Sequence, residues 1–157
     1  MGLGQHIHYF AITIPRPSDE LVLGLVVVAG RYPFLPKPSQ TGVLLWFCST
    51  IPQEVLERHL PQPLPKGLGK IAVDIAVTLS FQNNWAGRTG THAHPDGGEK
   101  LIQFYENTCN MQPLSSKTAL PTLGRRLFSV NDGRYYYLDE TTALQFSQDL
   151  THLRKKE

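Results

Sequence analysis

Hydrophobic and polar residues follow a strand-like pattern near the beginning of the chain. Residues 6–14 alternate between the two classes, and residues 21–29 and 41–51 are almost wholly apolar. Alternation and an abundance of β-branched and aromatic residues are typical of strands, and a strand that is apolar on both faces belongs in the middle of a sheet. A proline-rich loop over residues 30–40 separates the last two. The pattern predicts a β-meander of three strands, with the third one central.

The spacing of apolar residues changes to that of a helix after Gly67. Apolar residues recur there at intervals of three and four: Leu68, Ile71, Ala72, Ile75, Ala76 and Leu79. This spacing predicts a helix that ends near residues 82–83, preceded by a helical turn over residues 52–59. A short strand over residues 88–94 and a second amphipathic helix over residues 99–107 follow. Because a helix that joins two strands at this spacing is a crossover connection, the strands on either side of it are predicted to pair in parallel.

The final part of the chain carries a hairpin signal and one more helical segment. Asn131-Asp132-Gly133 separates two strand-like runs, residues 126–130 and 134–138, and such a tripeptide is typical of a tight hairpin turn. Residues 141–153 predict a short helix. A length of 157 residues without an internal repeat or linker indicates a single domain over residues 1–157. The predicted fold class is α/β, or α+β, with a mixed and largely antiparallel sheet flanked by helices.

Composition and charge narrow the expected partners and location. The formal net charge is +2, the pI is near 8.6, and the dense basic run Arg154-Lys155-Lys156 is interpreted as a solvated tail. Nucleic acid is therefore excluded from the predicted partners. Residues 21–29 are too short to cross a bilayer, which takes about 20 residues, and no signal peptide is recognised. Two cysteines, Cys48 and Cys109, are too few for a disulfide framework. A cytoplasmic protein without membrane contact is expected.

Residues 41–111 contain an ordered set of elements: an apolar strand, a glycine turn, a helix, a short strand and a helix that closes with Phe104-Tyr105-Glu106. The turn reads Leu64-Pro65-Lys66-Gly67-Leu68-Gly69 and is followed by Lys70. This order resembles the core of the GNAT superfamily of N-acetyltransferases, in which the turn has the form Arg/Gln-x-x-Gly-x-Gly/Ala. The resemblance implies that the parallel strand pair is splayed near the centre of the sheet. It also implies acetyl-CoA, or coenzyme A, as the co-substrate.

The chain departs from the family pattern in several places. Leu64 stands where a basic or amide residue usually opens the turn, and Gly98 stands where an asparagine usually begins the later helix. Residues 51–67 form a longer connection than family members need, and the elements that generally precede the sheet are reduced. These departures bear on substrate selection and on activity.

The predicted coenzyme A site consists of a helix start and the end of a strand. Glycines allow a ligand to approach the backbone closely, and a helix N-terminus offers free amides to a pyrophosphate. Lysines on either side of the turn add two cations. The predicted binding residues are Ser49, Thr50, Ile51, Lys66, Gly67, Leu68, Gly69 and Lys70. The first three would offer backbone groups to the pantetheine arm where the strands splay. The alternative is a plain helix start after a proline loop.

The resemblance implies one catalytic role and leaves another open. In the family, a tyrosine at the position of Tyr105 commonly protonates the departing coenzyme A thiolate, and a phenol of pKa about 10 can donate to a thiolate of pKa about 8.5. The alternative is a packed helix aromatic. No carboxylate lies within residues 43–51, so the base is unassigned. His92 and His94 lie on one face of a predicted strand. They are candidates for the base, and the alternative is that they are ordinary structural histidines. No metal site is predicted.

Two functions from different classes remain open. The first is acyl transfer from acetyl-CoA to an amine, and the acceptor is open among small amines, peptide N-termini and lysines. The second is a catalytically reduced GNAT-like module that binds acyl-CoA or another protein without turnover. A homodimer is compatible with both.

Overall fold

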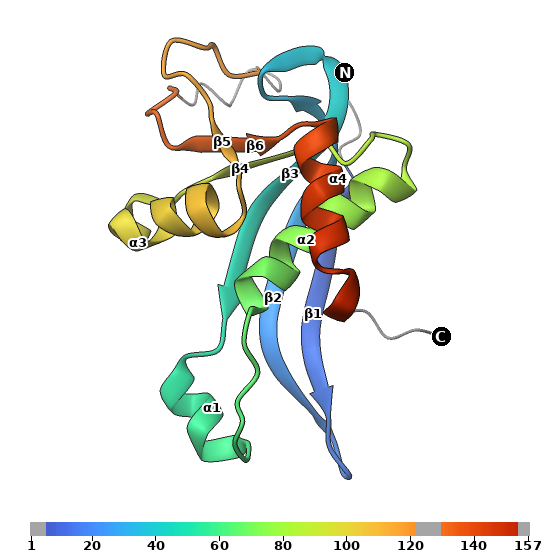
Figure 1. The fold of residues 1–157 in the computed structure, drawn as a ribbon, viewed down its shortest axis with the longest axis vertical. Coiled ribbons are helices and arrows are strands. Elements are labelled where there is room, and N and C mark those ends of the chain that lie inside the picture. The colour runs from blue at the N-terminus through green and yellow to red at the C-terminus, as the bar shows by residue number, and fades with distance from the viewer. Residues whose placement is uncertain (1–5, 122–129, 154–157) are drawn as a thin grey trace.

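The computed structural model describes residues 6–121 and 130–153, and within them six strands form one sheet in the order β1-β2-β3-β4-β6-β5 (Figure 1). The strands are β1 (Ile7–Pro15), β2 (Glu20–Phe34), β3 (Lys37–Thr50), β4 (Thr89–His92), β5 (Gln112–Pro113) and β6 (Tyr135–Leu138). The helices are α1 (Gln53–His59), α2 (Leu68–Gln82), α3 (Gly98–Gln103) and α4 (Glu140–Asp149), with 3₁₀ turns at Pro95–Gly97 and Thr151–Leu153 and a π-helical turn at Phe104–Thr108. None of the described helices is both long enough and apolar enough to cross a membrane.

The strands pair antiparallel except at the centre of the sheet. β3 and β4 run parallel, with residues 43–45 opposite residues 89–91, and helix α2 lies in the crossover between them. The other pairs of the described sheet are antiparallel. The predicted fold class, a mixed and mostly antiparallel sheet with one parallel pair and flanking helices, is confirmed.

The parallel pair is short, and its two strands part beyond it. β3 continues from Leu45 to Thr50, whereas β4 ends at His92, one residue past the last paired position. Beyond Leu45 the edge of β3 that faces β4 is therefore no longer paired with it. The pair is splayed, as the sequence resemblance implies.

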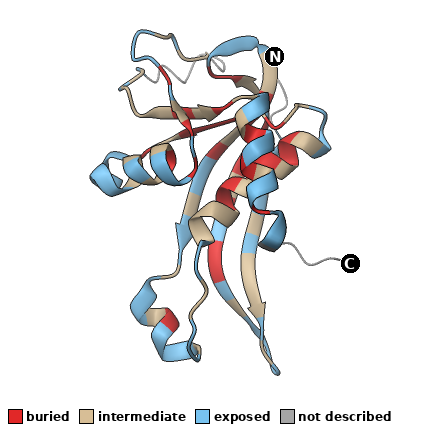
Figure 2. Cartoon of the chain, viewed as in Figure 1, coloured by how far each residue is buried: buried red, intermediate tan, exposed pale blue. Residues whose placement is uncertain are grey.

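Helix α2 covers the central strands. Its small and branched side chains, among them Ala72, Val73 and Ala76, are buried against β2 and β3, because residues three and four apart share one helix face. Helix α4 packs beside α2 and begins with a capping box, in which the Asp139 carboxylate accepts the Thr142 N–H at 2.9 Å. Both helices lie over one face of the sheet in Figure 1, and Figure 2 shows the burial that results beneath them.

The other face of β1–β3 presents apolar side chains to solvent. The register places Tyr9 beside Val27 and Val27 beside Phe47. This row points away from α2, because the adjacent Val26 is buried in the core and successive side chains alternate between faces. The exposed large apolar side chains on this side are Ile7, Tyr9, Val22, Leu25, Trp46 and Phe47. We call them the exposed apolar face.

Two predictions about the strands are wrong. Residues 30–40 do not form a loop, because β2 runs on to Phe34 and β3 begins at Lys37, with register shifts near the prolines. Such bulges let a strand keep pairing past residues that lack a ladder donor. β6 pairs with β4 and β5 rather than with a hairpin partner. Of that expected partner, residues 126–129 lie outside the described residues and Val130 belongs to no strand.

Candidate functional site

A cavity of about 350 Å³ lies where β3 and β4 part. It is lined by β3, by β4 and by the helical segment that follows β4: Leu45, Trp46, Phe47, Cys48, Thr91, His92, His94, Leu101 and Tyr105. The parting of the strands makes room for it, because the backbones no longer pair there. Tyr105, the predicted catalytic residue, therefore shares a cavity with the end of β3.

The Tyr105 side chain is held firmly inside this cavity. It is 4% exposed, and its ring stacks on the Tyr136 ring with 5.8 Å between centroids. Its hydroxyl is hydrogen-bonded to Thr91. Thr91 also donates its own hydroxyl proton to the Leu45 carbonyl of β3 at 3.1 Å. Burial raises the pKa of Tyr105 to about 12, against a lowering effect of Thr91, so the phenol keeps its proton at neutral pH and can act as a proton donor.

Helix α2 begins at a glycine without a side-chain cap. Gly67 has a φ of +78°, in the left-handed region that favours glycine, and a Cβ there would meet nothing within 4 Å. The first bond into the helix runs from the Ile71 N–H to the Gly67 carbonyl at 3.0 Å. The amides of residues 68–70 therefore have no partner within the helix. An open, uncapped helix start of this kind suits an anionic phosphate group.

At Gly69, packing rather than backbone conformation requires a residue without a side chain. A Cβ on Gly69 would lie 2.8 Å from the Phe104 ring, so the first turn of α2 packs tightly on the residue next to Tyr105. This contact joins the helix start to the wall of the cavity. The sequence assigned both glycines to ligand approach, whereas only Gly67 borders open space.

The end of β3 offers backbone groups that differ from the predicted ones. The Ile51 N–H donates to the Leu23 carbonyl of β2 at 2.8 Å, so it is not free. Hydrogen-bonding groups alternate along an antiparallel strand, so Ser49 also turns its groups toward β2, whereas Cys48 and Thr50 turn theirs toward the splay. Of the predicted Ser49, Thr50 and Ile51, only Thr50 therefore turns its backbone groups toward the splay, as does the unpredicted Cys48. The register with β2 decides this, and the sequence did not specify it.

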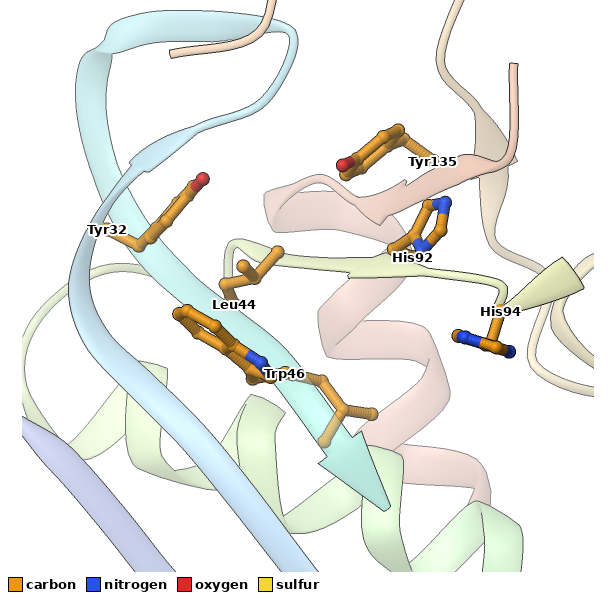
Figure 3. A pocket seen from close by; sticks show the side chains of 7 residues that line it. Tyr32, Leu44, Trp46, His92, His94 and Tyr135 are labelled. Carbon is orange, nitrogen blue, oxygen red and sulfur yellow. The ribbon is translucent and has the colours of Figure 1, made fainter. Parts of the chain in front are cut away.

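A second cavity, of about 270 Å³, adjoins the first (Figure 3). Its lining comes mainly from β2, β3, β4 and β6: Tyr32, Leu44, Leu45, Trp46, His92, His94 and Tyr135. Leu45, Trp46, His92 and His94 line both cavities, which therefore meet where the strands part. We call the first the tyrosine cavity, after Tyr105, and the second the histidine cavity, after His92.

His92 is bound to a carboxylate. Its Nε2 lies 2.8 Å from Asp132 Oδ2, and its ring centroid lies 4.5 Å from that of Tyr135. Burial alone would raise the pKa of Asp132, but hydrogen bonds from His92 and the Arg134 N–H lower it below its usual value. Asp132 is therefore ionised at neutral pH. The sequence assigned Asp132 to a hairpin turn and missed this contact, because the pairing of β4 with β6 brings it to His92.

His94 and the two cysteines differ from His92 in their surroundings. The His94 side chain is 71% exposed, and its Nδ1 accepts the Asp96 N–H at 3.3 Å. Cys48 and Cys109 are free thiols, and burial raises the pKa of both, that of Cys109 to about 12. Neither is a thiolate at neutral pH. Within the described ranges, no group of three or more His, Cys, Asp or Glu side chains is arranged to hold a metal ion.

No protein-family model matches the sequence, and no curated protein matches it. Among solved structures, the chain is similar to a chain of "The crystal structure of KacTA-DNA complex", with 16% identical residues and a TM-score of 0.57. The likeness covers 93% of this chain and 76% of that chain. The likeness supports the predicted GNAT-like fold. At this level of identity it shows the fold alone.

This likeness corrects one expectation about partners. The sequence analysis excluded nucleic acid, whereas the solved structure that the chain resembles is a complex with DNA. The exclusion is wrong. A small net charge describes the isolated chain, and it carries no information about complexes that contain further components.

Proposed function

We propose that this protein is an acyltransferase that moves an acyl group, such as acetyl, from acyl-CoA to an amine. One observation carries the proposal: a buried, protonated Tyr105 lines a cavity at the strand splay, and the neighbouring Phe104 packs on the uncapped start of α2 at Gly69. The GNAT-like fold supports it, because the splayed pair β3 and β4 is joined through the glycine turn and helix α2, in the order that the sequence resemblance implies.

The residues present fit coenzyme A at two places. The free amides of residues 68–70, beside the open Gly67, suit the pyrophosphate, and Lys66 and Lys70 add positive charge. Cys48 and Thr50 offer backbone groups to the amides of the pantetheine arm along the edge of β3. Phe104 connects the two places through its contact with Gly69.

Acyl-CoA supplies an activated thioester, and the chain supplies position and a proton. Holding both reactants in place beside Tyr105 removes much of the entropic barrier. As the amine bonds to the acyl carbon and the carbon–sulfur bond breaks, Tyr105 gives its proton to the sulfur. A hydroxyl that is still protonated at neutral pH is suited to this step.

Thermal unfolding with and without acetyl-CoA tests the binding half of the proposal. A ligand at 100 times its Kd adds about 2.7 kcal/mol to the stability of the native state, which raises the Tm of a domain of this size by roughly 5–10 °C. Adenosine, which lacks the pyrophosphate, is the matched control and should leave the Tm unchanged. An unchanged Tm with millimolar acetyl-CoA would contradict the proposal. Release of free coenzyme A in the presence of a panel of amines then tests turnover.

A second candidate function is a GNAT-like module that binds acyl-CoA or other macromolecules without turnover. Two observations favour it: the exposed apolar face on β1–β3, and the occurrence of the similar solved chain in a complex with DNA. Large apolar side chains gathered on one surface are typical of interaction sites. Binding of acetyl-CoA without release of coenzyme A to any amine would select this candidate over the first.

A further inference from the structure

The histidine cavity is lined by two imidazoles and three aromatic rings, and Asp132, which is outside the lining, is bonded to one of the imidazoles, that of His92. Figure 3 shows Tyr32, Trp46 and Tyr135 around the space that His92 borders, each from a different strand. Burial raises the pKa of Tyr32, and the electrostatic influence of Tyr135 adds to the rise. The proposed binding of acyl-CoA uses the tyrosine cavity, so this neighbouring cavity is available to the second substrate.

The hydrogen bond to Asp132 decides which nitrogen of His92 carries the proton. An ionised carboxylate only accepts, so in the neutral imidazole Nε2 donates to Asp132 Oδ2. Nδ1 then keeps its lone pair, and no hydrogen bond to it is present among the residues that the structure describes. Asp132 is itself fixed, because its Oδ1 accepts the Arg134 N–H at 2.9 Å. An oriented base therefore lies where the two cavities meet.

The remaining lining restricts the chemistry of an acceptor. Aromatic faces attract cations, most strongly the face of a tryptophan, and the Trp46 side chain is 55% exposed. An ammonium group can therefore be held there before it loses a proton. Apart from the two histidines, the lining contains no Lys, Arg, Asp or Glu. It offers no partner to a carboxylate or to a second ammonium group, which favours a monoamine.

We propose that His92 is the general base of the acyl transfer, that Asp132 positions it, and that the acceptor is a primary monoamine on an apolar or aromatic carbon skeleton. This inference rests on the proposed acyl transfer and names the acceptor class for the same site. Three strands contribute the aromatic rings and β4 contributes the base, so the acceptor lies in the histidine cavity, which Tyr105 does not line.

The protons balance through His92, Tyr105 and solvent. The bound ammonium first gives a proton to His92 Nδ1, which releases it to solvent. The free amine then forms the carbon–nitrogen bond as the carbon–sulfur bond breaks, and Tyr105 protonates the sulfur. The nitrogen gives its second proton to His92, and solvent returns that proton to Tyr105. One proton is released overall for each amide and each free thiol formed.

Steady-state release of coenzyme A from acetyl-CoA with 2-phenylethylamine tests the base. Replacing His92 by Ala should lower the rate by about 10²–10⁴-fold, the usual contribution of a general base. Acetyl-CoA affinity should stay within about threefold of wild type, and added imidazole should restore part of the rate. His59→Gln is the matched control, because it alters an exposed histidine of α1 that lines neither cavity, and it should keep the rate within about threefold. Full activity in His92→Ala would overturn the assignment.

Asp132 and the aromatic lining have separate readouts. Asp132→Asn should lower kcat with little change in KM for the amine, and Asp132→Glu should recover part of kcat because it restores the carboxylate. A purely structural role would not predict this recovery. Trp46→Leu should weaken binding of 2-phenylethylamine, measured by calorimetry without turnover, by roughly three- to tenfold. Unchanged amine binding in Trp46→Leu would overturn the role of the aromatic lining.

The choice of amine separates this inference from the function on which it rests. The wild-type protein should release coenzyme A faster with 2-phenylethylamine than with spermidine or lysine. Faster release with spermidine or lysine would overturn the acceptor class and leave acyl transfer standing. Absence of release with every amine, while acetyl-CoA still binds, would overturn the acyl transfer and the inference together.

Discussion

The tyrosine cavity and the histidine cavity meet where β3 and β4 part, and the residues proposed to act in them, Tyr105 and His92, differ in their exposure to water. Tyr105 is 4% exposed beneath the helical segment that follows β4, whereas the His92 side chain is 30% exposed and that of Trp46 is 55% exposed. Helices α2 and α4 cover one face of the sheet, and the other face is open along β1–β3. One parallel strand pair thus lies between a buried phenol and a partly exposed imidazole.

This difference fits the tasks proposed for the two residues. A proton donor must keep its proton until the sulfur departs, and burial, which raises the pKa of Tyr105 to about 12, favours the protonated form. A base must receive an acceptor and return protons to solvent, and the half-open position of His92 allows both. The following predictions test the comparison in order of expected effect.

The largest effect is expected for Tyr105→Phe, which removes the hydroxyl and keeps the ring. The rate of coenzyme A release should fall by about 10²–10⁴-fold, whereas acetyl-CoA affinity should change less than about threefold, because the hydroxyl acts mainly on the departing sulfur. Tyr136→Phe is the matched control. It removes a hydroxyl from the ring stacked on Tyr105, but that hydroxyl bonds to Glu106 at 3.1 Å. Equal rates for wild type and Tyr105→Phe, with chemistry rate-limiting, would leave Tyr105 as a packing residue.

Gly69→Val should act on stability through the packing between α2 and Phe104. A side chain at this position would enter a space in which a Cβ already lies 2.8 Å from the Phe104 ring. Overpacking of this kind costs about 1–3 kcal/mol, measurable as a lower free energy of unfolding in urea. Stability equal to that of the wild type would show that the helix start does not pack on the wall of the tyrosine cavity as described.

Gly67→Asp should act on ligand affinity rather than on stability. Aspartate tolerates the left-handed conformation better than most residues, and a Cβ at this glycine meets open space. Its negative charge should repel the pyrophosphate and weaken acetyl-CoA binding by about tenfold, measured by calorimetry. Gly67→Asn is the control, with a side chain of the same shape and no charge. If both variants bind acetyl-CoA as well as the wild type, the pyrophosphate site is misplaced.

The smallest effect concerns acid stability at Asp132. Its pKa is lower in the folded protein than its ordinary value, so its contribution to stability is complete above the unfolded pKa of about 3.9 and is lost as pH falls through the lower, folded pKa. As the pH falls from about 5 to about 2, the Asp132→Asn variant should therefore lose less stability than the wild type. Thermal unfolding across this range measures the difference. Identical acid profiles would mean that the bond between Asp132 and His92 is not kept in solution.

The helices of this protein were largely readable from local pattern. The apolar spacing from Leu68 to Leu79 predicted helix α2 and its end, and the helix–strand order predicted the parallel pairing of β3 with β4. Residues 30–40 were misjudged as a loop, because their prolines suggested a break that the register shifts of β2 and β3 absorb. The periodicity of apolar residues indicates the local conformation well. It does not indicate bulges, because a bulge depends on how two strands pair.

The candidate site was readable only in part. Tyr105 and Gly67 were named from their place in the order of motifs, and the structure brings their surroundings together through Phe104. Asp132 and Trp46 were missed as site residues. Asp132 was interpreted as a turn residue, and no nearby residue in the sequence indicates that the pairing of β6 with β4 brings Asp132 to His92.

By itself, the sequence determined the local features of this protein: where the chain is helical or extended, and where a glycine permits a left-handed turn. These features depend on neighbours a few residues apart. Only the tertiary structure decided that the Ile51 N–H donates to β2 and that Thr91 lies between Tyr105 and Leu45. It also decided that Asp132 is bonded to His92. Each of these contacts depends on strand order and register, and a shift of one residue in register turns every side chain of a strand to the opposite face.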